Sequence, residues 1–285
     1  MKIKKILKIG LTVACCLIIS ACQFGNNSLE NANIYTTTYP INYLVKTLYG
    51  SHALNISSIY PSDCDITTYE IPEKNNKEFA SADLFVYNGL TNEKDIAKNL
   101  VNINRDLLII DVSYGLTLTN EVNELWLSPN NYLMLAKNIK DNLIEYVNNK
   151  SIKEDIEEKY TSFEENISLL DAALHNIGKS TDQTIVVSSN GLKFLENYGF
   201  NIISLKDENN LKEIKLNNIK NNFKNKKYKY LIVADNDNND ELVKEITDNY
   251  KPEIISINTM TLSLEDDYFN VINEFIENLK NISNQ

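Results

Sequence analysis

The sequence predicts an α/β fold of two lobes, each a mostly parallel sheet covered by helices, joined by one long rigid helix. Short runs rich in Ile, Val, Thr and Tyr alternate with amphipathic segments in two blocks, 34–146 and 184–279, a rhythm typical of parallel α/β sheets. A single long amphipathic segment, 151–177, separates these blocks. Because open parallel sheets bind ligands at the carboxyl ends of their strands, we expect a ligand crevice between the two lobes.

The amino-terminal lobe is expected at 34–148, after a polar tether at 22–33. Its strands are predicted where β-branched and aromatic residues cluster, and Pro61 ends the second of them. Its last helix is predicted from apolar residues that recur three or four positions apart. The predicted strands are 34–38, 55–60, 84–87 and 107–112, and the predicted helices are 41–49, 73–80, 93–101 and 130–146.

A connecting helix is expected at 149–178 and a carboxyl-terminal lobe at 179–285. Apolar residues recur at spacings of three and four from Ile152 to Leu174. At about 1.5 Å per residue this helix spans roughly 40 Å, the width of a domain. Coiled-coil pairing is the alternative, but the chain offers no equally long partner. The second lobe has predicted strands at 184–188, 201–205, 228–234 and 253–257, and helices at 191–198, 214–223, 240–249 and 268–279.

The amino terminus has the features of an exported lipoprotein. Four lysines in the first eight residues precede the apolar stretch 9–21, which is the length of a signal-peptide core and too short to span a bilayer. Ser20 and Ala21 before Cys22 resemble a bacterial lipobox, in which the cysteine is diacylated with palmitate-type lipid. We therefore expect a signal peptide at 1–21 and a lipid anchor on the extracytoplasmic face of the cell membrane. An ordinary secretion signal, in which Cys22 has no role, is the alternative.

The composition argues against nucleic-acid binding and against an enzyme. The formal net charge is −11, whereas a phosphate-binding surface needs a positive field. No Gly-x-Gly occurs, which excludes the common dinucleotide and P-loop cradles. His52 and His175 lie outside any metal or catalytic motif, so packing or solvated roles are expected for both. Cys64 is the only cysteine after Cys22, so no intramolecular disulfide is expected if Cys22 is lipidated.

Three segments resemble a known family. They are Tyr69-Glu70 with the following SADLFVYNGL at 81–90, the LWLSP run at 125–129 before a helix, and 188–200 after the first strand of the second lobe. With the long connecting helix, they make the mature chain similar to the zinc/manganese solute-binding lipoproteins of bacterial ABC importers. This resemblance implies a solute-binding role outside the cytoplasmic membrane, an ABC permease as partner, and no enzymatic activity.

The positions of the family's metal ligands carry different residues in this chain. The resemblance implies three or four ligands in the crevice, usually histidines plus a carboxylate. The first falls on Thr67 and the second on Glu124. The third falls on Ser189 or Asn190, because a one-residue gap leaves the choice open, and the fourth falls on Asn258. No histidine lies at any of these positions.

These replacements predict a crevice that does not capture zinc tightly. Imidazole and thiolate suit zinc, whereas hydroxyl, amide and carboxylate oxygens remain here. Glu124 is the best candidate metal ligand, and Asp235 and Cys64 are further crevice candidates, although a lone cysteine is more typical of packed apolar surroundings. The sequence establishes no cofactor. A hard divalent cation held weakly, a small polar molecule, and a decayed site that faces water are all compatible with these groups.

Two functions are compatible with these features. The first is an extracytoplasmic solute-binding lipoprotein of a metal-type ABC importer whose metal site is degenerate. The alternative is a surface adhesin or interaction lipoprotein that retains the scaffold without a transport cargo. In both, the partners include the lipid bilayer, through Cys22, and exclude nucleic acid.

Overall fold

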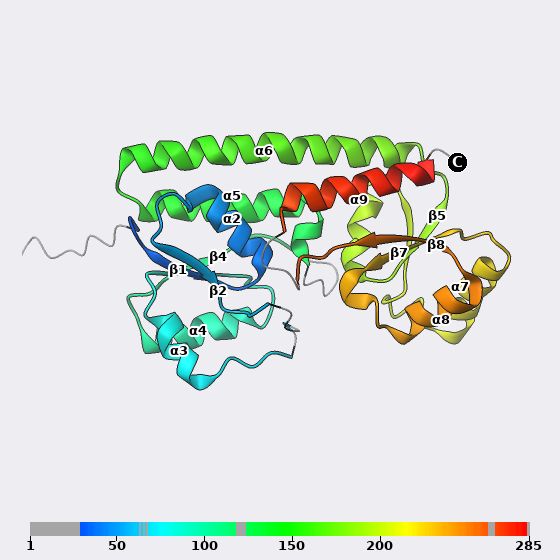
Figure 1. Cartoon of the computed structure of the whole chain (residues 1–285), viewed down its shortest axis with the longest axis horizontal. Helices are drawn as coiled ribbons and strands as arrows, with labels where there is room; N and C mark the ends of the chain where they lie inside the picture. The colour runs from blue at the N-terminus through cyan, green and yellow to red at the C-terminus, as the bar shows by residue number, and fades with distance from the viewer. Residues whose placement is uncertain are drawn as a thin grey trace, which may run out of the picture.

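The computed structural model describes residues 29–283, apart from 63, 65, 67, 118–123 and 262–265. Two α/β lobes lie side by side, and helix α6 (Lys150–Lys179) runs along both of them (Figure 1). The predicted signal peptide and Cys22 lie outside the described residues. No helix within the described ranges is both long enough and apolar enough to cross a membrane.

The amino-terminal lobe is built on a parallel sheet of four strands in the order β2-β1-β3-β4. Along the central strand, Leu84 and Val86 belong to one hydrophobic core and Phe85 and Tyr87 to another. This alternation buries both faces of the sheet, as parallel sheets require. The elements are β1 (Asn33–Thr36), α2 (Tyr39–Tyr49), β2 (Asn55–Ser58), α3 (Glu73–Ala80), β3 (Leu84–Tyr87), α4 (Glu93–Ile103), β4 (Leu108–Asp111), the 3₁₀ turn η2 (Leu125–Leu127) and α5 (Pro129–Tyr146).

The carboxyl-terminal lobe repeats this arrangement with the strand order β6-β5-β7-β8. Its central strand alternates in the same way: Ile232 and Ala234 face one core, and Leu231 and Val233 face the other. The elements are β5 (Thr184–Val187), η3 (Asn190–Tyr198), β6 (Asn201–Ser204), α7 (Glu213–Lys224), β7 (Tyr230–Ala234), η4 (Asp235–Asp237), α8 (Glu241–Tyr250), β8 (Glu253–Ile257) and α9 (Tyr268–Ser283).

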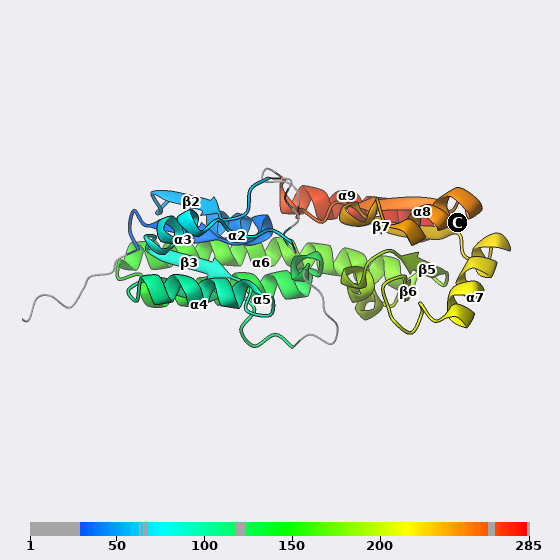
Figure 2. The same ribbon diagram turned by 90° about the horizontal axis from the view of Figure 1, so that it is seen from below.

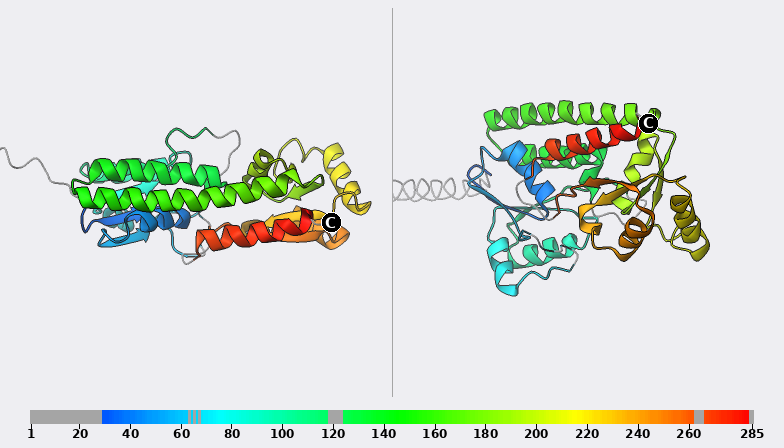
Figure 3. Two further views of the ribbon diagram at one scale, coloured as in Figure 1. Left: turned by 90° about the horizontal axis from the view of Figure 1, so that it is seen from above. Right: turned by 45° about the vertical axis from the view of Figure 1, so that its right-hand side comes forward.

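The helices on one face of the two sheets form a continuous layer. Residues of α2, α5, α6 and α9 share a single hydrophobic core that reaches into both lobes. Seen from above, α6 crosses both lobes with α5 and α9 beside it (Figure 3). The ring of Tyr268, at the start of α9, lies 4.0 Å from the ring of Tyr132 on α5. The lobes are therefore joined by a packed helical layer as well as by the connecting helix.

The opposite face of each sheet is covered separately. Helices α3 and α4 cover the amino-terminal sheet, and α7 and α8 cover the carboxyl-terminal sheet (Figures 1 and 2). Each pair of helices forms its own smaller core with its sheet. The layer of α2, α5, α6 and α9 is thus shared by the two lobes. The pair α3 and α4 and the pair α7 and α8 each belong to one lobe.

The predicted fold class is confirmed, and each predicted strand and helix has a counterpart. Two local differences have simple causes. Strand β1 ends at Thr36 rather than at residue 38, because Thr38 already precedes helix α2, whose first turn contains Pro40. The predicted helix at 191–198 is a 3₁₀ helix that ends at Gly199, where a φ of 95° favours glycine.

Candidate functional site

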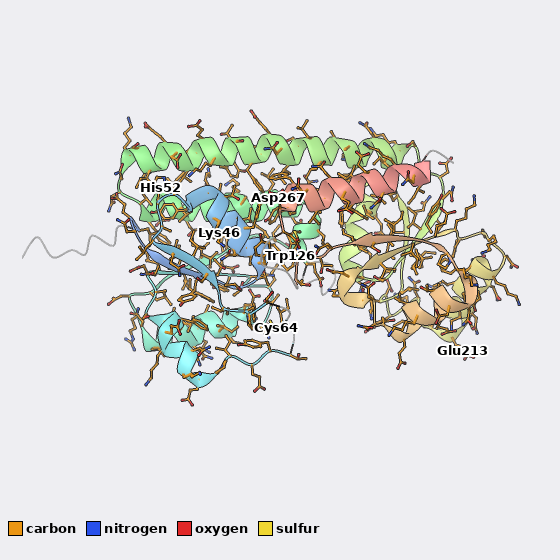
Figure 4. The ribbon with its side chains drawn as sticks, viewed as in Figure 1. Lys46, His52, Cys64, Trp126, Glu213 and Asp267 are labelled. Atoms are coloured by element: carbon orange, nitrogen blue, oxygen red, sulfur yellow. The ribbon has the colours of Figure 1, made fainter. Side chains whose placement is uncertain are left out.

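Residues that follow the strands of both sheets meet at the junction between the lobes. The Tyr39 hydroxyl, after β1, donates to the carbonyl oxygen of Asp266 at 2.6 Å. The Tyr43 hydroxyl on α2 donates to Oδ2 of Asp267 at 3.0 Å. Figure 4 shows Asp267 near Trp126 between the two lobes. Direct hydrogen bonds therefore bridge the lobes beside the predicted crevice.

Trp126 lies at the centre of this junction. Its side chain is 1% exposed, and its indole N–H donates to the carbonyl oxygen of Thr259, after β8, at 2.8 Å. Its own carbonyl oxygen accepts from the Tyr268 hydroxyl at 3.1 Å. One residue of η2 is thus hydrogen-bonded to two segments of the carboxyl-terminal lobe, which fixes the wall of the crevice that carries Glu124.

Glu124 reaches across the crevice. Its Oε1 accepts a hydrogen bond from Nδ2 of Asn236 in η4 at 3.0 Å. A Cβ built on Gly191 would lie 3.3 Å from Oε2 of Glu124 and 3.3 Å from Oγ of Ser189. The side chains of Glu124 and Ser189 therefore lie together beside Gly191, at one corner of the crevice. Burial raises the pKa of the Glu124 carboxyl; the Asn236 amide opposes this shift and the nearby Asp237 and Asp235 carboxylates add to it.

Two further carboxylates stand on η4. Oδ1 of Asp235 accepts from the backbone N–H of Thr259 at 3.0 Å and from its hydroxyl at 2.5 Å. Oδ2 of Asp237 accepts from the Ser188 hydroxyl at 2.8 Å. Burial raises the pKa of Asp237, while Ser188 and Lys206 oppose the shift. Desolvation is thus the main cause of both raised pKa values, and the neighbouring carboxylates add a smaller contribution.

Ser189 and Asn190 face different surroundings. Oγ of Ser189 accepts from the N–H of Gly191 at 3.0 Å, which starts η3 on the side of Glu124. The Asn190 side chain accepts from the Ser204 hydroxyl at 2.8 Å and donates to the Lys206 carbonyl at 3.2 Å. Ser189 therefore lies at the Glu124 corner, and Asn190 is engaged with the loop after β6.

The side chain of Asn258 is hydrogen-bonded within the loop that follows β8. Its Nδ2 donates to Oδ2 of Asp266 at 2.7 Å, and its Oδ1 accepts from the N–H of Met260 at 2.7 Å. Met260 has a φ of 58°, and the hydrogen bond to Asn258 supports this left-handed backbone. Asn258 thus shapes the loop beside Asp235 rather than presenting a bare amide.

The other two predicted residues, Cys64 and Thr67, follow β2 in the sequence. Thr67 is outside the described residues. Cys64 is half-buried and packs against the lower core of the amino-terminal lobe, beneath the sheet. Such partly apolar surroundings are typical of a small packed hydrophobe.

The described residues of the crevice offer oxygen donors. In the described part of the chain, no group of three or more His, Cys, Asp or Glu side chains is arranged to hold a metal ion. The groups that converge near Glu124 are carboxylate, hydroxyl and amide oxygens. Such oxygens suit hard cations, whereas zinc prefers imidazole and thiolate.

Sequence reasoning missed Asn236 and Asp237, which contribute directly to this site. Both lie in the Asp-Asn-Asp run 235–237, and only its first residue was predicted to face the crevice. The other two residues of the run could also have been predicted to face the crevice. Successive residues of a 3₁₀ turn that follows a strand lie at the same edge of the sheet. Thr259 and the indole of Trp126 were also not predicted as the link between the lobes.

The comparisons place this architecture in a family. The family model described as ZnuA, zinc-uptake complex component A, periplasmic, matches residues 34–282. The chain belongs to this family. The zinc-bound ZnuA-like domain of Streptococcus pneumoniae AdcA is 20% identical, with a TM-score of 0.73 over 90% of this chain and 100% of that one. A search among curated proteins gives no match.

Two other solved structures have the same fold. A zinc-bound deletion mutant of ZnuA is 17% identical, with a TM-score of 0.71 over 88% of this chain and 96% of that one. A periplasmic metal-binding protein from Candidatus Liberibacter asiaticus is 18% identical, with a TM-score of 0.70 over 86% and 98%. The ZnuA family is one of extracytoplasmic solute-binding proteins of metal-type ABC importers rather than of enzymes. The resemblance seen in the sequence is thus confirmed.

Proposed function

We propose that this ZnuA-family protein delivers a hard divalent cation, held weakly, to an ABC permease. The observation that carries the proposal is the Glu124 carboxyl, which reaches across the crevice to Asn236 beside two further carboxylates on η4. Carboxylate, hydroxyl and amide oxygens favour Mn²⁺ or Ca²⁺ over zinc. Because no complete group of ligands is preformed among the described residues, water would supply several ligands and the affinity would be low.

Glu124→Gln should weaken the binding of Mn²⁺ and Ca²⁺ by at least tenfold, because it removes one negative charge from the crevice and keeps the side-chain volume. Calorimetric titration of the purified mature protein with each metal chloride measures this effect. The matched control is Glu213→Gln, on α7 at the far end of the carboxyl-terminal lobe (Figure 4). This control should bind both ions as the unmodified chain does.

Two outcomes would contradict the proposal. Stoichiometric zinc in protein purified without chelator, measured by elemental analysis, would show that the crevice captures zinc after all. Equal affinity in the unmodified chain and in Glu124→Gln would place the cation elsewhere. A thermal shift with small polar metabolites but with no metal would favour a polar organic cargo, because any ligand at 100 times its dissociation constant adds about 2.7 kcal/mol to the stability.

The proposal includes a lipid anchor at Cys22, the signal peptide 1–21 and the tether 22–33. The lobes would then occupy 34–148 and 179–285, with the helix 149–178 between them, on the extracytoplasmic face of the cell membrane. Cys22→Ser should abolish incorporation of radiolabelled palmitate and release the protein from the membrane fraction, because one acylated cysteine supplies the attachment. Cys64→Ser is the control and should stay membrane-bound. Unchanged lipid labelling in Cys22→Ser would refute the anchor.

A surface adhesin that uses the same scaffold is the alternative. The family match favours solute binding, since the matching model describes an uptake component. Loss of metal uptake after deletion of the gene, with unchanged adherence of the cells, would support the transport role over adhesion.

A further inference from the structure

A cavity lies at the edge of the amino-terminal lobe, beside the junction between the lobes. It has a volume of about 180 Å³ and opens at the carboxyl ends of β1, β2 and β3, where its lining includes Thr38, Tyr60, Asn88, Glu93 and Trp126. A water molecule in the liquid occupies about 30 Å³, so the cavity has the volume of roughly six waters. It is smaller than the pockets of about 300 Å³ or more that hold drug-sized ligands. A compound of only a few non-hydrogen atoms would fit.

The described lining of the cavity contains a buried acid and no basic side chain. Glu93 is 3% exposed, and its Oε2 accepts from the backbone N–H of Asn88 at 2.8 Å. None of the described residues that line the cavity is basic. Burial raises the pKa of the Glu93 carboxyl to about 7, polar contacts with Asn88 and Thr37 oppose the shift, and Asp111 adds to it. An ionised carboxylate in such surroundings is costly unless a cation pairs with it.

The cavity also contains a buried hydroxyl with no partner. Thr38 is 4% exposed, and its Oγ1 makes no hydrogen bond to any group that the structure describes. Although Thr38 precedes helix α2, its side chain does not cap the helix. Buried polar groups are nearly always hydrogen-bonded, so this hydroxyl is available to a polar atom that enters the cavity.

Two aromatic side chains complete the walls. Tyr60 and Trp126 both line the cavity, and the faces of such rings attract ammonium groups. We propose that the cavity binds a small organic ammonium compound, with the ammonium paired to Glu93 and a second polar group hydrogen-bonded to Thr38. A carboxylate, aromatic walls and a spare hydroxyl together match the charge, the shape and the hydrogen-bonding capacity of a short amino alcohol.

This cavity and the crevice proposed for the divalent cation differ in the carboxylates that they offer. Among the described residues that line it are Glu93 and Ile66, which is next in the chain to the predicted crevice position Thr67, but not Glu124, Asp235 or Asp237. Trp126 lines the cavity, and its indole N–H also bonds to Thr259 across the junction. The two proposals can therefore fail independently.

Trp126 provides a direct measurement, because it is the single tryptophan of the chain. Its fluorescence is followed while the purified protein is titrated at pH 8 with methylammonium or ethanolammonium chloride. The controls are ethylene glycol, a neutral compound of similar size, and sodium chloride at equal ionic strength. We expect a saturable change with ethanolammonium, a weaker response with methylammonium, and none with the controls. No saturable change with either ammonium compound, or an equal change with ethylene glycol, would overturn the proposal.

Three variants locate the response. Glu93→Gln should raise the dissociation constant of ethanolammonium at least tenfold. Thr38→Val should raise it severalfold and should fold normally, because the hydroxyl that it removes makes no hydrogen bond within the described chain. Glu124→Gln should bind ethanolammonium as the unmodified chain does while losing affinity for Mn²⁺. If folded Glu93→Gln keeps the full affinity, or if only Glu124→Gln loses it, the ammonium group binds elsewhere and the proposal is wrong.

Discussion

Replacing Trp126 with alanine should lower the free energy of unfolding by about 3–5 kcal/mol, the range for deleting a large aromatic side chain from a packed core. The side chain is 1% exposed in the core that both lobes share. The substitution also removes the indole N–H that bonds to Thr259, which leaves a buried carbonyl without its donor. Urea unfolding followed by circular dichroism measures the change, since the variant lacks tryptophan fluorescence.

Tyr114→Ala is the matched control for this substitution. Tyr114 is also a large aromatic residue of the amino-terminal lobe, but it is 78% exposed. Its removal should change the free energy of unfolding by no more than about 0.5 kcal/mol. A loss below about 1 kcal/mol in Trp126→Ala would mean that the indole is not packed between the lobes as the structure places it.

Much of the fold could be predicted because it follows from local patterns. The run Tyr230 to Ala234 is apolar at every position, as expected for a strand with helices on both faces, and its residues do alternate between two cores. Helix α6 was predicted to within about two residues at each end, because its apolar stripe is continuous. The start of α2 could have been placed better, since Pro40 is typical of a first helical turn.

The site was less predictable because its contacts join residues far apart in the chain. Glu124 and Asn236 are separated by 112 positions, and no periodic pattern relates them. The resemblance to the family indicated which positions to inspect, and Glu124 and Ser189 do lie together at one corner. It could not indicate that the loop after β8 would engage Asn258, because that depends on the backbone turn at Met260.

No pattern in the sequence predicted the cavity of the amino-terminal lobe. Glu93 was read only as the first residue of a predicted helix, where acidic residues are ordinary. Its burial results from the packing of α4 beneath β3 and from the hydrogen bond to Asn88. Thr38 was likewise read as the end of a strand. The sequence gives residue types, but it does not say which polar side chains remain buried without a partner.

Glu93→Gln should stabilise the protein at pH 8 by about 3 kcal/mol and should have little effect near pH 4.5. In the unfolded chain this carboxyl ionises near its ordinary pKa of 4.5, whereas burial raises the pKa to about 7 in the folded state. Between these values the folded protein holds a proton that the unfolded chain has lost, so the stability falls as pH rises and the loss is complete above about pH 7. Glutamine stays neutral and still accepts the hydrogen bond from Asn88, which removes this loss.

Urea unfolding of both proteins between pH 4.5 and pH 8 measures the effect as a difference that widens with pH. In the part of the chain that the structure describes, Tyr60 and Asp111 are the ionisable groups that interact with Glu93, and neither supplies a positive charge that would stabilise the ionised carboxylate. Glu213→Gln, which changes an exposed carboxylate, should show a difference of no more than about 0.5 kcal/mol at any pH in this range. A constant difference between Glu93→Gln and the unmodified chain would mean that Glu93 ionises alike in the folded and unfolded states. Such a result would contradict the burial on which the cavity's charge depends.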